Sequence, residues 1–129
     1  MIRESIKKAE KVFEELEKEV TKRNINGGGI EKREFDKLFT QLAEKHLGYG
    51  FVELGDTLIY ADSRDKPEKV LAVEEAWFYF TCHEDPGGLE IPGIILVDCD
   101  VSKDEPPVVL GFHAFFNRAR AFNPLKEWA

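Results

Sequence analysis

The sequence predicts a single α+β domain over residues 1–129, in which two N-terminal helices and a C-terminal helix pack on an antiparallel sheet of four to five strands. Two observations support this fold class. Apolar residues recur at helical spacing up to residue 47, and from Tyr49 onward they form short runs rich in β-branched and aromatic residues. A length of 129 residues, 43% of them hydrophobic and 33% charged, suits one globular domain.

The first helix is indicated by apolar residues spaced alternately by four and three positions, with Lys and Glu on the remaining faces. The segment NINGGG, residues 24–29, ends it because three glycines do not hold a helix. A second helix is expected from Glu31 to Leu47, with His46 partly buried at the edge of its apolar stripe. The apolar residues of the first helix are Ile2, Ile6, Ala9, Phe13, Leu16 and Val20.

Strands are expected in the middle of the chain. Residues 51–61 predict a hairpin with a two-residue loop at Gly55 and Asp56. Residues 70–82 predict a strand in their second half, while their first half fits either a helix or a strand. A long loop follows, then a strand at 94–101 and a short edge strand at 108–110.

The C-terminal segment GFHAFFNRARAF, residues 111–122, is ambiguous between helix and strand. We prefer a helix, because five apolar residues fit one helical face and Pro124 would end it. These five are Phe112, Phe115, Phe116, Ala119 and Phe122.

Alternation along the strands places Phe78, Phe80 and Cys82 on one face, and Val97 and Cys99 on the same face of the next strand. We expect the helices to cover this apolar face, so that both cysteines are buried and chemically quiet. If the two strands pair around the DPGG turn with residue numbers summing to about 173, Cys99 lies opposite Glu74 or Glu75. That position is about 25 Å from Cys82, too far for a disulfide.

The stretch WFYFTCHEDPGG, residues 77–88, combines a thiol and an imidazole beside a turn. Adjacent strand residues point to opposite faces, so His83 is badly placed to activate Cys82 as a nucleophile. The chain contains no CxxC, HxxxH or HExxH pattern, so we expect no zinc site and no cofactor. The stretch is therefore expected to be a core strand that runs into a loop.

The strand IILVDCDV ends in an Asp-x-Asp pattern, and in this respect it resembles the aspartyl-phosphate phosphatases of the haloacid dehalogenase type. The resemblance implies Asp98 as nucleophile and Asp100 as acid/base, with magnesium between them. That family also needs a parallel sheet and later lysine and acidic motifs, for which the following sequence has no room, so we reject the assignment. Asp98, Asp100 and Asp104 could instead bind a divalent cation without the phosphatase chemistry, since such cations prefer clustered carboxylates. We favour the interpretation that these side chains simply face solvent.

The net charge of −7 is concentrated in the middle of the chain. Residues 51–110 contain 4 Lys and Arg against 14 Asp and Glu, a net charge of −10, whereas residues 1–50 carry +1 and residues 111–129 carry +2. Such a field repels nucleic acid and anionic membranes and attracts basic partners. Solubility alone is the alternative explanation.

Neither a membrane nor a secretory route is indicated. No apolar run approaches the roughly 20 residues that span a bilayer, and the N-terminal segment MIRESIKKAEK lacks the apolar stretch of a signal peptide. We therefore expect a cytoplasmic protein with free thiols.

The sheet face opposite the helices is predicted to present aromatic side chains among carboxylates. Trp and Tyr are enriched at binding hot spots, and acidic surroundings steer a basic partner. The alternative is that the C-terminal segment covers the aromatics and makes a second core. The predicted partner-binding residues are Glu53, Glu75, Trp77, Tyr79, Asp98, Asp100, Asp104 and Glu105.

These features predict a monomeric or weakly dimeric, non-enzymatic domain that masks a basic protein partner. The most specific form of this hypothesis is an immunity protein or antitoxin against a nuclease toxin, whose phosphate-binding surface the carboxylates would occupy. The first alternative is a small-ligand-binding or hydrolytic enzyme with a pocket between the sheet and the C-terminal helix, using His113, Asn117 and Arg120 beside an acid. The second is a module that dimerises through the apolar seam of the first helix.

Overall fold

The computed structural model describes residues 2–27, 29–62, 69–82, 88–100 and 106–122. These residues form two α-helices, six strands and one 3-10 turn, which confirms the α+β character but not the predicted arrangement. The elements are α1 (Ile2–Ile25), β1 (Ile30–Glu31), α2 (Lys32–His46), β2 (Gly48–Asp62), β3 (Lys69–Cys82), β4 (Gly88–Asp100), β5 (Val108–Ala114), η1 (Phe116–Arg118) and β6 (Arg120–Phe122).

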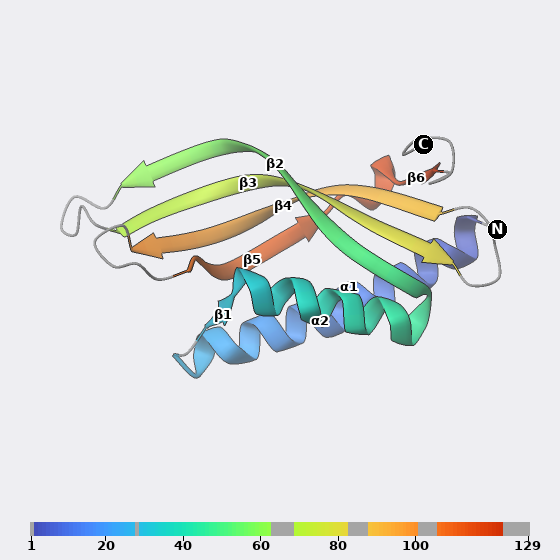
Figure 1. Cartoon of the computed structure of the whole chain (residues 1–129), viewed down its shortest axis with the longest axis horizontal. Helices are drawn as coiled ribbons and strands as arrows, with labels where there is room; N and C mark the ends of the chain where they lie inside the picture. The colour runs from blue at the N-terminus through green and yellow to red at the C-terminus, as the bar shows by residue number, and fades with distance from the viewer. Residues whose placement is uncertain (1, 28, 63–68, 83–87, 101–105, 123–129) are drawn as a thin grey trace.

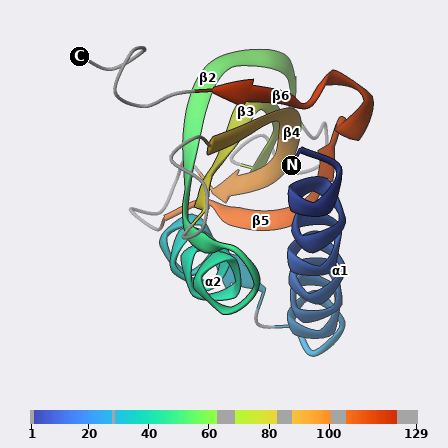
Figure 2. The same cartoon turned by 90° about the vertical axis from the view of Figure 1, so that its right-hand side faces the viewer.

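The strands form one antiparallel sheet in the order β1-β5-β4-β3-β2, and β6 pairs with the beginning of β4. Figure 1 shows both helices on one side of this sheet, and Figure 2 shows that the sheet is curled. The two edges differ in length, because β1 has 2 residues whereas β2 has 15. We call the sheet face that carries the helices the helix-covered face and the opposite one the outer face.

The core lies between the helices and the helix-covered face, and Phe13 of α1 is at its centre. Its ring lies 4.9 Å from the ring of Phe78 and 6.0 Å from that of Phe80, centroid to centroid. Both predicted helices are confirmed, with their apolar stripes buried in this core. The apolar seam of α1 is therefore not available for the predicted dimerisation. Its buried members are Ala9, Val12, Phe13, Leu16 and Val20.

The predicted alternation along β3 and β4 is confirmed. Phe78 and Phe80 are fully buried and Val97 is nearly so, all on the helix-covered face. The predicted pairing register is wrong, because Cys99 lies opposite Val70 rather than near Glu74. Cys99 of β4 therefore lies beside the beginning of β3, whereas Cys82 ends β3. The side chain of Cys82 is outside the described part of the structure.

The glycine-rich segment ends α1 as predicted. Gly27 and Gly29 have φ values of +83° and +67°, which favour glycine over other residues. The side-chain amide of Asn24, at the end of the helix, donates hydrogen bonds to the backbone oxygens of Val109 and Leu110 in β5, at 3.3 and 3.2 Å. The chain can therefore turn tightly from α1 into β1 while remaining fastened to the sheet.

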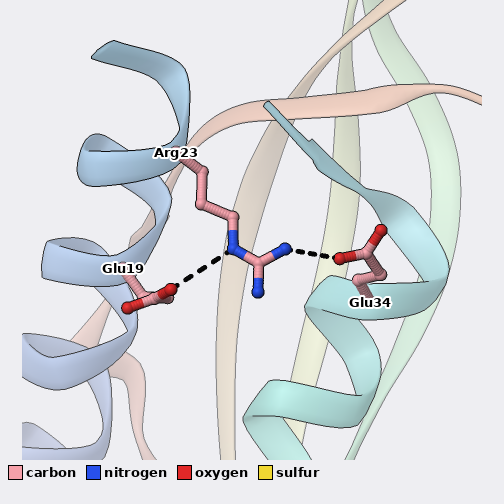
Figure 3. Close-up of polar contacts among 3 residues, drawn as sticks. All are labelled: Glu19, Arg23 and Glu34. Atoms are coloured by element: carbon pink, nitrogen blue, oxygen red, sulfur yellow. Dashed lines mark hydrogen bonds and ion pairs between the residues drawn. The ribbon is translucent and has the colours of Figure 1, made fainter. Parts of the chain in front are cut away.

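Two polar clusters join α1 to α2. The guanidinium of Arg23 donates hydrogen bonds to Glu19 of its own helix and to Glu34 of α2, at 3.2 and 2.5 Å (Figure 3). At the other end of α2, the carboxylate of Glu15 lies 2.8 Å from Nζ of Lys45 and 2.6 Å from Nε2 of His46. His46 is partly buried, as predicted, and it serves the contact between helices.

The predicted C-terminal helix is wrong. Residues 108–114 form β5, residues 116–118 form a 3-10 turn, and residues 120–122 form β6. A register shift between β4 and β5 leaves Leu110 as an extra residue, so Val109 and Phe112 face the same side although they are three positions apart. That spacing resembles helical periodicity. The segment is nevertheless a strand, because as β5 it forms backbone hydrogen bonds with β4.

The predicted hairpin at Gly55 and Asp56 is also wrong, because β2 continues through both residues as one strand. Two bulges interrupt its pairing with β3. Gly55 and Asp56 together lie opposite Glu75, and no residue of β3 lies opposite Leu58. The glycine and aspartate that suggested a turn are instead bulge residues, which allow the edge strand to bend. The first half of residues 70–82 is strand, not helix.

The predicted loop before residue 94 is shorter than expected, since β4 begins at Gly88. Pro92 lies within this strand, between the part that pairs with β5 and the part that pairs with β6. Proline has no N–H to donate, and this gap between two partners is a position where a strand tolerates it. Its carbonyl oxygen accepts a hydrogen bond from the backbone N–H of Phe115 at 2.8 Å.

Candidate functional site

The outer face is defined by residues that lie directly opposite one another in the register. Glu53 of β2 pairs with Trp77 of β3, and Glu75 pairs with Ile94 of β4. Neither α1 nor α2 lies on this side of the sheet (Figure 1). The side chains of the outer face on the three long strands include Tyr49, Phe51, Glu53, Ile59, Leu71, Val73, Glu75, Trp77, Tyr79, Glu90, Ile94, Leu96 and Asp98.

Most of the predicted partner-binding residues are brought together on the outer face. Glu53, Glu75, Trp77, Tyr79 and Asp98 lie there on three adjacent strands. Asp100 ends β4 opposite Lys69, and its side chain is outside the described part. Asp104 and Glu105 are outside the described residues.

The predicted aromatic residues are less exposed than a contact surface requires. The ring of Trp77 is half-buried over β2, where a Cβ added to Gly55 would lie 2.5 Å from it. Tyr79 is only 9% exposed, and its ring stacks on that of Phe51 at 4.8 Å between centroids. These rings pack within the sheet and leave only part of their surface to solvent.

The phenol of Tyr79 is held in its neutral form. Burial, and after it the nearby carboxylates of Glu90 and Glu53, together raise its pKa to about 12. The hydroxyl also donates a hydrogen bond to Glu53. Tyr79 therefore acts as a fixed donor within the face at neutral pH, not as an acid or base.

Glu90 and Arg120 form an ion pair that the sequence alone did not reveal. The carboxylate of Glu90 is almost fully buried and accepts a hydrogen bond from Nη2 of Arg120 at 2.7 Å. The two residues lie opposite each other on β4 and β6, 30 positions apart in the chain. The pair fastens β6 to the sheet beside Tyr79.

Apolar side chains lie between the carboxylates, and sequence reasoning missed them as site residues. Val73, Ile94 and Leu96 are partly exposed, while Leu71 and Ile59 are more open, at 45% and 62% exposure. Ile59 and Leu71 are diagonal neighbours across β2 and β3. The alternation of β3 contained this information, because Leu71 and Val73 share a face with Glu75, while the other face of the strand is apolar except for Glu74.

The charge on the three long strands has one sign. Together β2, β3 and β4 contain eight Asp and Glu residues, whereas Lys69, at the first position of β3, is their single Lys or Arg. The acidic side chains therefore have little cationic compensation within the strands that carry them. A surface of this kind produces a negative potential that attracts cationic groups.

The alternative catalytic site loses its basis. His113 lies on β5, Asn117 in η1 and Arg120 on β6, so the three do not share a helical face, and the helix that was to form one wall of the pocket is a strand instead. In the described part of the chain no group of three or more His, Cys, Asp or Glu side chains is arranged to hold a metal ion.

Cys99 does not have the environment of a reactive thiol. Burial raises its pKa, and the carboxylates of Asp98 and Glu74 raise it further. A raised pKa lowers the fraction of thiolate, which is the nucleophilic form. The side chain is partly buried against the core under the helix-covered face.

Comparison with known proteins does not assign the chain to a family. It matches no protein-family model, no curated protein and no solved structure. Within the described residues, neither helix combines the length and apolar character needed to cross a membrane. The function of the outer face must therefore be inferred from its own residues.

Proposed function

We propose that the protein is a binding domain whose outer face holds a basic protein partner. The observation that carries this proposal is the composition of the outer face. Partly exposed apolar residues such as Val73 and Leu96 lie beside the carboxylates of Glu75 and Asp98, on strands almost free of lysine and arginine.

The combination favours a protein over a small ion as the partner. Protein interfaces bury a central apolar area inside a polar rim, and the apolar residues between the carboxylates provide such an area. The carboxylates contribute mainly to the rate and specificity of association, because they attract a basic surface over distances comparable to the Debye length. Solubility would be served by the carboxylates alone and does not account for the apolar residues among them.

The most specific form of the proposal is inhibition by masking. A basic protein that acts on nucleic acid exposes Lys and Arg side chains that bind phosphates. The carboxylates of Glu53, Glu75 and Asp98 would pair with these side chains and block them. An immunity protein or antitoxin against a nuclease toxin would work in this way. A cytoplasmic location, where a free thiol such as Cys99 persists, is part of this proposal.

Photo-crosslinking tests the proposal. A benzophenone-bearing amino acid is introduced in place of Val73 on the outer face, and in a second protein in place of Gln41, which is exposed on α2. Each is irradiated in an extract of the native host at low and at high salt, and the products are identified by mass spectrometry. We expect a basic protein to be captured from position 73 at low salt, and not from position 41.

The captured protein is then purified and its binding measured directly. Inhibition predicts that a nucleic-acid-processing activity of the captured protein falls when the domain is added in equimolar amount. Capture of the same proteins from positions 73 and 41, or of a partner that is not basic, contradicts the proposal.

A further inference from the structure

The bulged segment of β2, residues 53–59, is exposed over its whole length. Three of its residues are large and apolar, with exposed fractions of 42% for Leu54, 53% for Leu58 and 62% for Ile59. In Figure 1 the end of β2 lies at the top of the molecule, with β3, β4 and β5 between it and the helices. The described part of the chain therefore leaves about half of the surface of these side chains open to solvent.

The two bulges distribute the apolar side chains around the sheet edge. Leu54 lies opposite Ala76 and therefore on the helix-covered side, whereas Ile59 lies opposite Val73 and therefore on the outer face. Leu58 is the extra residue of the second bulge. The segment is thus an apolar ridge that is accessible from both sides of the sheet.

Single exposed apolar residues are ordinary on protein surfaces, but a cluster is informative. Seven large hydrophobic residues are exposed among the described residues, and four of them lie at this end of the sheet. The fourth is Leu71, which borders Ile59 on the outer face. The ridge is therefore continuous with the apolar area of the proposed binding face.

The edge that carries the ridge is interrupted by bulges and carries carboxylates, but it has none of the lysine, arginine and proline residues that often protect a sheet edge. Across all of Gly48–Asp62 there is no lysine, arginine or proline. The bulges themselves disturb the regular hydrogen-bonding pattern, so addition of a further strand is disfavoured at residues 54–59. An occupant must instead contact the ridge through its side chains.

The charges next to the ridge select the kind of occupant. Glu53 and Asp56 lie within the segment, and β2 provides no cation to neutralise them. A second copy of this chain would bring these carboxylates toward their counterparts, whereas a basic protein would pair with them. Charge complementarity therefore favours a basic partner over self-association.

We infer that the bulged segment is the anchor of partner binding. Leu54, Leu58 and Ile59 enter an apolar groove of the basic partner, and lysine or arginine residues at the rim of that groove meet Glu53 and Asp56. Trp77 supports the ridge from below, since its ring packs against Gly55. This inference rests on the proposed function and adds the chemistry of the partner's surface.

Crosslinking at a second position separates the two claims. The benzophenone-bearing amino acid is placed at Leu58, and the products in native-host extract are compared with those from Val73 and from Gln41. We expect the same basic protein from positions 58 and 73. A partner captured at 73 but not at 58 overturns the anchor and leaves the outer face as the binding surface. Absence of any partner at both positions overturns both claims.

Dissociation rates of the purified pair then test the role of the ridge. Leu58→Ser and Ile59→Ser should each speed dissociation by about 30-fold, the equivalent of the 2 kcal/mol typical of an anchor residue. Leu110→Ser is the matched control, because Leu110 is an exposed apolar residue at a register shift in β5. Thermal melting checks that all three variants fold.

Two results would contradict the inference. Dissociation of Leu58→Ser and Ile59→Ser at the rate of Leu110→Ser would show that the ridge is not the anchor. Crosslinking of position 58 to a second copy of the chain, together with a dimer in sedimentation analysis, would show that the ridge serves self-association instead.

Discussion

The two faces of the sheet use the same strands for different purposes. On β3, Phe78 and Phe80 point toward the helices and are fully buried, whereas the intervening Tyr79 and the preceding Trp77 belong to the outer face. The helix-covered face is closely packed and mainly apolar, while the outer face mixes apolar residues with carboxylates. The difference indicates that the main apolar core lies on one face, which leaves the other available for the proposed binding.

Truncation of the central phenylalanine should have the largest effect. Phe13 contacts the rings of five other phenylalanines, so Phe13→Ala should lower the free energy of unfolding by about 3–5 kcal/mol. Leu58→Ser, on the exposed ridge, should change it by less than about 0.5 kcal/mol. Urea denaturation of the two variants measures both values. Similar losses would show that the ridge is part of the core.

Three glycines provide a graded comparison of packing. At Gly50 an added Cβ would lie 2.5 Å from Cβ of Ala43 on α2, so Gly50→Ala should cost about 1–3 kcal/mol. Gly55→Ala should cost less, because the half-exposed ring of Trp77 can move. Gly111→Ala is the control, since no heavy atom lies within 4 Å of its added Cβ. Melting temperatures in any other order would contradict the assignment of close packing to the helix-covered face.

The ion pair that fastens β6 should have an intermediate effect. Arg120→Gln removes the cation that pairs with the nearly buried carboxylate of Glu90, and we expect a loss of about 1–2 kcal/mol in the free energy of unfolding. Glu90→Gln in the same chain should restore part of the loss, because the unpaired charge is then removed. Additive effects of the two changes in a double-mutant cycle would show that the pair contributes nothing.

The smallest effect is expected at the junction of the helices and depends on pH. Hydrogen bonds from Lys45 and then from His46 lower the pKa of Glu15 below its ordinary value of 4.5. The ion pairs therefore stabilise the fold above pH 4.5, and this contribution is lost as the pH falls through the lowered pKa of the folded state. Glu15 is 37% exposed, so solvent screening limits the contribution to less than about 1 kcal/mol.

Glu15→Gln should therefore destabilise the protein slightly at neutral pH and reduce the pH dependence of stability below pH 4.5. Chemical denaturation at several pH values measures both quantities. The comparison variant is Glu44→Gln, which makes the same change at an exposed position of α2. We expect this change to remove no ion pair. Equal pH profiles for the two variants would contradict the role of Glu15.

The parts of the fold that were predictable from the sequence are those with an unbroken period. The stripes of α1 and α2 keep their helical spacing, and the second half of β3 alternates strictly. The strands β2 and β5 could not be predicted correctly, because the bulge residues Gly55 and Asp56 suggested a turn in β2 and the extra residue Leu110 shifts the phase of the alternation in β5. In β5 this shift produced a spacing that favours a helix, and the segment is a strand because it pairs with β4 and β1.

The candidate site was predictable to the extent that it depends on alternation. Glu53, Glu75 and Asp98 were expected on one face and lie there. The ridge was not predictable, because Gly55 and Asp56 suggested a hairpin turn that would have placed Leu58 and Ile59 in a regular strand. The burial of the Trp77 and Tyr79 side chains depends on contacts with β2 and β4, and it could not be deduced from the sequence of β3 alone.

The most direct test of the binding face is a charge reversal on each side of the molecule. The association rate of the partner captured at position 73 is measured for Asp98→Lys and for Glu44→Lys, which makes the same change on the helical side. At about 0.1 M ionic strength Asp98→Lys should slow association by about 10-fold, and Glu44→Lys should have little effect. The difference should vanish near 1 M, where charges are screened beyond about 3 Å. Equal rates for the two variants at low ionic strength would contradict the claim that the outer face binds a basic protein.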